Sequence, residues 1–183
     1  MPRLATLAGA AALFWPPLAH AADAPATGSG TTYAIELEPH LAFGWDNIYG
    51  SSGVGAGMRL GVPVVQDLLP NVTDNLALTA GADFLHYEGC YFRDRCGANY
   101  LMFPATMQWN VFPVKRVGIF AEAGAFIYKG FVDGCTGGPG CERPSNFGLR
   151  PTLAFGGRLF VAEHVAVTVR IGYPTITLGA SFL

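Results

Sequence analysis

The strongest constraint in this sequence is a period of two residues, in which apolar side chains alternate with small or polar ones. Successive side chains of a β-strand point to opposite faces, so this period predicts strands rather than helices. The pattern recurs over eight segments that cover nearly all of the chain after residue 32: 33–45, 53–64, 76–84, 100–111, 117–128, 147–161, 165–171 and 176–182. We therefore expect an all-β protein, with eight antiparallel strands arranged up and down in sequence order.

The two faces of the predicted strands differ in chemistry. One face is apolar and uncharged, whereas the other is rich in Gly, Thr and Ala and has no Lys before Lys129. A water-facing surface would be rich in Lys and Glu, while small side chains suit the crowded interior of a narrow barrel. We therefore favour a transmembrane β-barrel, with its apolar face against lipid, over a soluble barrel of the lipocalin kind.

The other face is expected to form a polar, charge-balanced interior. Four acids and four arginines fall on it and sum to zero, and His40 lies among them: Glu36, Glu38, Asp83, Glu122, Arg59, Arg150, Arg158 and Arg170. Guanidinium groups bridge carboxylates with paired hydrogen bonds, which suits an enclosed network. Eight strands leave an interior just wide enough for side chains, so we expect a closed or nearly closed lumen.

The composition excludes several other classes of protein. Apolar residues make up 51% of the chain, charged residues 13%, and the net charge is −2. A disordered chain lacks such an apolar content, and a nucleic-acid-binding protein needs a basic surface. After the N-terminus there is no apolar run of about 18 residues, so no transmembrane helix is expected.

The N-terminus is expected to be a secretory signal peptide, residues 1–21. Arg3 precedes an apolar stretch from Leu4 to Leu18, and Ala19-His20-Ala21 supplies the small residues of a cleavage site. Residues 22–32 are small and polar and read as a flexible segment. The barrel is then expected to occupy residues 33–183.

The connections fit a barrel with both termini in the periplasm. The outer loops then lie near residues 46–52, 86–99, 129–146 and 173–174, and the periplasmic turns near 66–75, 112–116 and 162–164. Aromatic residues close to the strand ends would form the interfacial girdles: Trp45, Tyr49, Tyr87, Trp109 and Phe112. Pro39, Pro104 and Pro151 fall inside predicted strands, where we expect bulges or strand rims.

The cysteines form two local pairs, Cys90 with Cys96 and Cys135 with Cys141, in the two longest outer loops. In an exported protein this spacing favours two disulfides that pin those loops, although four cysteines allow three connectivities. A metal site is not expected, because the cysteines have neither CxxC spacing nor neighbouring histidines. The first loop also carries a mixture of aromatic and Arg residues that is common at binding hot spots: Tyr91, Phe92, Arg93 and Arg95.

With these features, residues 33–183 resemble the small eight-stranded outer-membrane proteins of the OmpA-transmembrane-domain and OmpX type. The most specific part of the resemblance is the C-terminal stretch from Val165 to Leu183, with Phe182 penultimate, which looks like the terminal strand read by the barrel-assembly machinery. The resemblance implies the cell outer membrane as location, and lipid, lipopolysaccharide and that machinery as partners.

Three functions are open at this point. We favour a closed, non-enzymatic barrel with a structural or surface-interaction role through its loops, without a cofactor and with an unidentified surface ligand. A narrow channel for small solutes is the second. The third is a lipid-A-modifying enzyme, whose nearest candidate constellation would combine His86, Asp83 or Glu88, and Ser51 or Ser52 near the outer rim.

Overall fold

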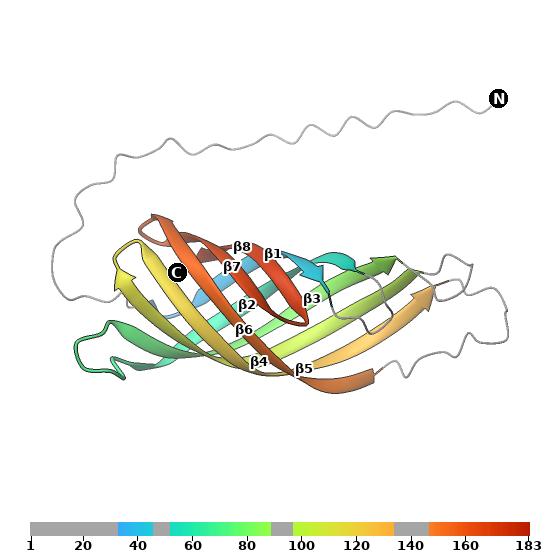
Figure 1. Ribbon diagram of the computed structural model, residues 1–183, viewed down its shortest axis with the longest axis horizontal. Helices are drawn as coiled ribbons and strands as arrows, with labels where there is room; N and C mark the ends of the chain where they lie inside the picture. The colour runs from blue at the N-terminus through green and yellow to red at the C-terminus, as the bar shows by residue number, and fades with distance from the viewer. Residues whose placement is uncertain (1–32, 46–51, 89–96, 134–146) are drawn as a thin grey trace, which may run out of the picture.

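The computed structural model describes residues 33–45, 52–88, 97–133 and 147–183. These residues form eight strands that close into one barrel in sequence order (Figure 1). The strands are β1 Glu36–Gly44, β2 Gly53–Gln66, β3 Asp74–Glu88, β4 Gly97–Val114, β5 Val117–Asp133, β6 Phe147–Ala162, β7 Val165–Tyr173 and β8 Thr175–Phe182. The predicted all-β, eight-stranded up-and-down architecture is therefore confirmed.

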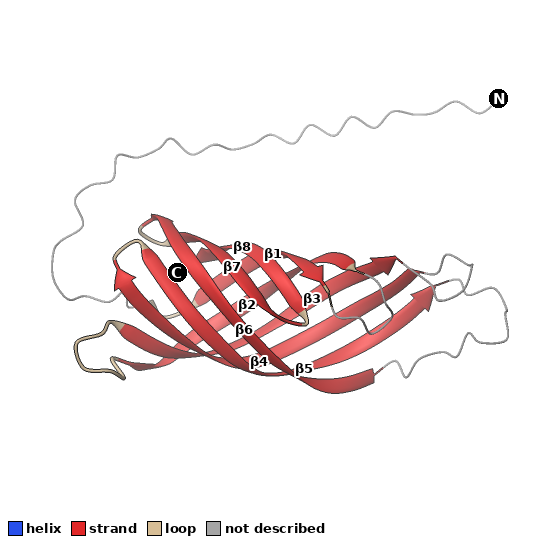
Figure 2. Cartoon of the chain, in the orientation of Figure 1, coloured by secondary structure: helices blue, strands red, loops and turns tan. Residues whose placement is uncertain are grey.

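Closure of the barrel comes from antiparallel pairing of β1 with β8, in which Leu41 lies opposite Leu178 and His40 opposite Gly179. Each remaining strand pairs with its neighbour in sequence, so the described secondary structure consists of strands and turns (Figure 2). No helix among the described residues is long and apolar enough to cross a membrane.

The predicted alternation of faces holds along the middle of each strand. On β1 and β8 the apolar side chains point outward, with Leu41 65% and Leu178 53% exposed, whereas Glu38 and Ser181 point inward and are 1% and 0% exposed. An apolar exterior around a polar interior places lipid outside the barrel, as in an outer-membrane β-barrel, and excludes the soluble alternative. The protein is thus a transmembrane barrel of the outer membrane.

Tyr33 is one exception to the predicted faces. The alternation over residues 33–45 puts it on the apolar, outward face, but it lies just before β1 and is 7% exposed. Burial raises the pKa of its hydroxyl above the ordinary value, against the opposing effect of the Arg158 guanidinium. The strand period therefore does not extend backward beyond Ile35, which is 56% exposed.

The prolines are accommodated without the bulges that we expected at them. Pro39 pairs with Met58 of β2, Pro104 with Phe126 of β5, and Pro151 with Ala125 of β5. On the opposite side, the ladder skips Pro39 and Pro104, and Pro151 lies beyond the last paired residue of β7. Proline lacks only the backbone N–H donor. A missing ladder hydrogen bond on one side of the strand therefore leaves no N–H group of the proline unpaired.

The register shifts lie elsewhere, at the end of the barrel that carries the short turns. They fall between Pro63 and Val65, between Val111 and Val114, and between Phe160 and Ala162. Bulges bend a strand and are common at barrel rims, which fits these positions.

Candidate functional site

The interior of the barrel holds the ionisable side chains singled out from the sequence. Seven of the eight expected charged residues, together with His40, are at most 7% exposed. They belong to β1, β2, β3, β5, β6 and β7 and come together because each lies at an inward position of its strand: Glu36, Glu38, Arg59, Asp83, Glu122, Arg158 and Arg170.

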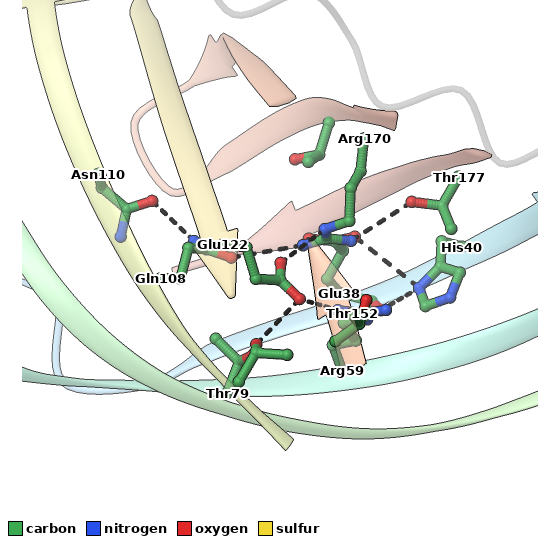
Figure 3. A network of polar contacts seen from close by, with 12 residues as sticks. Glu38, His40, Arg59, Thr79, Gln108, Asn110, Glu122, Thr152, Arg170 and Thr177 are labelled. Carbon is green, nitrogen blue, oxygen red and sulfur yellow. Dashed lines mark hydrogen bonds and ion pairs between the residues drawn. The ribbon is translucent and has the colours of Figure 1, made fainter. Parts of the chain in front are cut away.

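Arg170 of β7 is the centre of this network (Figure 3). Its two terminal nitrogens donate to the two carboxylate oxygens of Glu38, at 2.7 and 3.2 Å, and its Nε donates to Glu122 Oε2 at 2.9 Å. The guanidinium also lies 5.1 Å from the centre of the Phe120 ring. Arg170 thereby joins carboxylates of two strands, β1 and β5, that are not adjacent in the barrel wall.

The remaining contacts of the network lead from Glu122 back to Glu38. Arg59 donates to Glu122 Oε1, and its second terminal nitrogen lies 3.7 Å from Asp83 Oδ2. His40 Nε2 lies 3.0 Å from Asp83 Oδ1, and His40 Nδ1 lies 3.8 Å from Glu38 Oε1. Glu38, Arg170, Glu122, Arg59, Asp83 and His40 therefore form a closed ring of interactions, which we call the central ring.

A second ion pair lies next to the central ring. Arg158 Nη2 lies 2.6 Å from Glu36 Oε1, and Arg158 Nη1 donates to Asn110 Oδ1 at 3.1 Å. Asn110 in turn donates to Asn75 Oδ1 at 2.7 Å. These amides extend the polar interior toward the end of the barrel with the short turns.

Glycines make room for the central ring. A Cβ atom at Gly57, on the inner side of β2, would lie 2.1 Å from Asp83 Oδ1 and 2.8 Å from His40 Nε2. Gly179 of β8 lies opposite His40, and a Cβ there would approach the Pro39 carbonyl to 2.6 Å. The high glycine content of the inner face is thus a requirement of packing at these positions.

Arg150 corrects the expected charge balance. It is half-buried near the start of β6, at the end of the barrel opposite the short turns, donates to the Tyr173 hydroxyl at 2.9 Å, and lies 5.6 Å from the centre of the Tyr128 ring. Among the described residues that face the inside of the barrel, four buried carboxyls therefore face three buried guanidinium groups, with His40 as the remaining basic side chain. The alternation predicted correctly that Arg150 lies on the inner face. It could not predict how far along the barrel axis the side chain lies.

An aromatic and apolar layer separates the central ring from the end of the barrel opposite the short turns. It contains Leu85, Met102 and Phe126, which are 0%, 5% and 2% exposed, and the rings of Tyr87 and Tyr100, which meet edge to face with centroids 5.4 Å apart. The assignment of Tyr87 to the interfacial girdle is therefore wrong, because its ring faces the interior. Below this layer, a cavity of about 10 Å³ lies among Glu36, Glu38, Arg59, Thr79 and other network residues. A cavity of this size holds about one water molecule.

The candidate catalytic residues near the outer rim are not brought together with Asp83. His86 is partly buried on β3, and its Nδ1 lies 2.7 Å from Asn99 Oδ1, whereas Asp83 points inward to His40 and Arg59. The two residues are three positions apart on a strand and so face opposite sides of the wall. The constellation of His86 with Asp83 is therefore wrong; Ser51 and the side chain of Glu88 lie outside the described part.

The cysteines and the loop residues predicted as a binding surface all lie outside the described residues. The predicted disulfides of Cys90 with Cys96 and of Cys135 with Cys141 therefore stay predictions, as does the assignment of residues 1–21 and 22–32. The same holds for the aromatic and Arg residues of the first loop: Tyr91, Phe92, Arg93 and Arg95.

Within the described ranges, no group of three or more His, Cys, Asp or Glu side chains could hold a metal ion. Gln108 and Asn110 fall on the inner face by the alternation over residues 100–111, and both are buried there. Asn75, which carries no face signal of this kind in the sequence, is the partner of Asn110 in the network. Asn75 lies at the start of β3, where the sequence analysis expected a turn.

Comparison with known proteins was made by sequence and by fold. No family model matches the sequence, and no curated protein matches it. The attachment invasion locus protein Ail of Yersinia pestis, solved in complex with the heparin analogue sucrose octasulfate, is 11% identical, with a TM-score of 0.48 over 81% of this chain and 95% of that chain. The outer membrane enzyme PagL is 14% identical, with a TM-score of 0.47 over 80% of this chain and 98% of that chain. These likenesses concern the barrel fold alone.

Proposed function

We propose that this protein is a closed outer-membrane barrel with a structural or surface-interaction role, carried by disulfide-pinned extracellular loops. The observation that carries the proposal is the filled interior. The central ring spans the inside from β1 to β5, and the layer of Leu85, Met102 and Phe126 lies between it and the outer end. A hydrated path for solutes needs more room than a cavity of about 10 Å³.

The loops are the part of the molecule proposed to contact partners. A disulfide of Cys90 with Cys96 and another of Cys135 with Cys141 would each close a short loop. The first loop would present aromatic rings and guanidinium groups to the medium, from Tyr91, Phe92, Arg93 and Arg95. Lipopolysaccharide surrounds the outer rim of such a barrel, and the barrel-assembly machinery is the expected partner during insertion. The surface ligand itself is unidentified.

Conductance in planar bilayers tests the closed lumen. Purified, refolded protein should give no stable, reproducible unitary currents at concentrations at which a general porin, measured in parallel, inserts readily. Reproducible channels from the heat-modifiable, folded form would establish the small-solute channel instead.

The proposed non-enzymatic role is tested separately. Lipid A extracted from cells that produce the protein should have the same mass spectrum as lipid A from cells without it. A new lipid A species that is lost in the His86→Ala variant, at equal levels of folded barrel, would make the protein a lipid-A-modifying enzyme.

A further inference from the structure

The turn between β2 and β3, residues Asp67–Thr73, exposes apolar side chains at a place where turns are normally polar. Leu68, Leu69 and Val72 are 47%, 42% and 36% exposed. This turn projects beyond the other two turns at the same end of the barrel, at the left of Figure 1. An exposed apolar tip on an otherwise ordered hairpin needs a partner that is itself apolar.

Hydrogen bonds hold the turn in one conformation. The Asp67 N–H donates to the Asp74 carbonyl at 2.9 Å, and the Leu69 N–H donates to Asp74 Oδ1 at 3.3 Å. Asp67 and Asn71 adopt positive φ values of 52° and 65°, and Asp and Asn tolerate this region well. The leucines are therefore presented by a preorganised turn.

Trp109 relates this turn to the membrane surface. Its indole Nε1 donates to Asp74 Oδ2 at 2.8 Å, so one carboxylate binds both the tryptophan and the backbone of the turn. Trp109 lies on the outer face of β4 and is 39% exposed. Because tryptophan favours the boundary between hydrocarbon and headgroups, this bond places the turn at headgroup level.

The length of the lipid-facing belt also places the turn at headgroup level. The outward apolar residues of β2 run from Val54 to Val64, which spans about 25 Å along the membrane normal at the usual rise and tilt of barrel strands. That length matches the apolar band of an outer-membrane barrel. The turn begins three residues further on, so Leu68 and Leu69 lie next to the edge of the belt, at the level of the headgroups.

The neighbouring turn supplies the charge that a lipid surface requires. The connection from β4 to β5 contains Lys115 and Arg116, both exposed, at the same end of the barrel. The β6–β7 turn differs, because it carries Glu163 and His164, whose side chains are 89% and 72% exposed. An apolar tip beside two cations is complementary to phospholipid, with acyl chains below a layer of phosphates.

We propose that the Asp67–Thr73 turn is a membrane anchor that inserts Leu68, Leu69 and Val72 into the phospholipid leaflet at the periplasmic side, while Lys115 and Arg116 contact lipid phosphates. This inference rests on the proposed function in that it requires an inserted barrel. The occupant of the apolar tip is lipid, so the turn does not recruit a periplasmic protein.

Fluorescence quenching by brominated lipids tests the anchor. The full mature chain is refolded into vesicles of phosphatidylethanolamine and phosphatidylglycerol, with or without bromine on the acyl chains. The Leu69→Trp variant should add blue-shifted emission that brominated lipid quenches, relative to the parent with Trp45 and Trp109. The matched Glu163→Trp variant, in the β6–β7 turn, should add emission typical of water that is not quenched.

The outcomes separate the two proposals. If Leu69→Trp and Leu68→Trp barrels both remain heat-modifiable but their added emission is water-like and unquenched, the anchor is wrong and the barrel stands. If the parent itself gives no folded, inserted form, the proposed function fails first. A photo-crosslinking p-benzoylphenylalanine at position 69 in cells should give an adduct with the mass of one phospholipid, and an adduct with a protein would overturn the lipid assignment.

Discussion

Arg170 and Glu38 lie 132 residues apart in the chain and meet inside the barrel through two hydrogen bonds, at 2.7 and 3.2 Å. The strands that carry them, β7 and β1, flank β8, which closes the barrel. Their contact therefore forms only when the ends of the barrel have come together, and it adds a charged bridge across the closing seam.

The first prediction concerns this bridge. Arg170→Leu leaves Glu38 and Glu122 without their shared guanidinium, and breaking a buried pair from one side costs about 3–5 kcal/mol. Glu163→Gln, in the exposed β6–β7 turn, should change the free energy of unfolding by no more than about 0.5 kcal/mol. Urea unfolding in lipid vesicles, followed by the heat-modifiable gel shift, measures both, and equal stability of the two variants would contradict the network.

The second prediction compares arginines at different depths. Arg158→Leu removes the partner of Glu36 and should cost about 3 kcal/mol, and Arg59→Leu should cost a similar amount at the central ring. Arg150→Leu should cost about 1 kcal/mol or less, because Arg150 is half-buried and its contacts include a tyrosine hydroxyl and ring. The same unfolding assay ranks the three, and an Arg150 variant as unstable as the others would refute the depth assignment.

The third prediction uses two glycines of the barrel wall. Gly57→Ala places a methyl group against Asp83 and His40 and should destabilise the barrel by about 1–3 kcal/mol. At Gly157 the nearest atom to a new Cβ would be the Gly118 carbonyl oxygen at 3.7 Å, so Gly157→Ala should be neutral or stabilise by about 0.5 kcal/mol. Comparable losses at both sites would show that the strand backbone, rather than the packed ring, is what tolerates only glycine.

The fourth prediction is that the folded protein is heat-modifiable. A closed ladder leaves no free edge from which detergent could unzip the strands, so an unboiled sample should migrate differently from a boiled one. Cell fractionation should place the protein with the outer membrane. Recovery in the soluble periplasm, with identical migration of both samples, would exclude the membrane barrel.

The sequence predicted the faces of the strands because parity alone decides them. The alternation over residues 33–45 puts Leu41 and Glu38 on opposite sides, and their exposures of 65% and 1% agree. Parity does not give depth along the axis or which strands meet across the interior. The half-buried position of Arg150 and the contact of Arg170 with Glu38 therefore required the register of the strands.

The sequence predicted which residues make up the site, but not which of them contact one another. A set of inward acids and arginines indicated a network, yet nothing in the spacing of His40 and Asp83 predicted their 3.0 Å contact. The burial of Asp74 could not be predicted for another reason. By alternation it falls on the outward side of β3, and only the indole of Trp109 and the backbone of the β2–β3 turn make its burial possible.

The last prediction concerns the proposed binding loop. Deleting Tyr91–Arg95 should leave the barrel assembled and heat-modifiable, since β3 and β4 pair from Glu88 and Gly97 inward and the deletion lies beyond that ladder. Binding of the surface ligand to cells that produce the deletion variant should then fall to the level of cells without the protein. The aromatic and Arg side chains that would make the contacts are absent from this variant. A variant with Cys90 and Cys96 both changed to Ser keeps those side chains but loses the cross-link, so it should bind more weakly than the parent and still assemble. If the deletion prevents assembly, the loop is a folding element; if it leaves binding unchanged, the contact surface lies elsewhere, and in either case the function assigned to this loop is wrong.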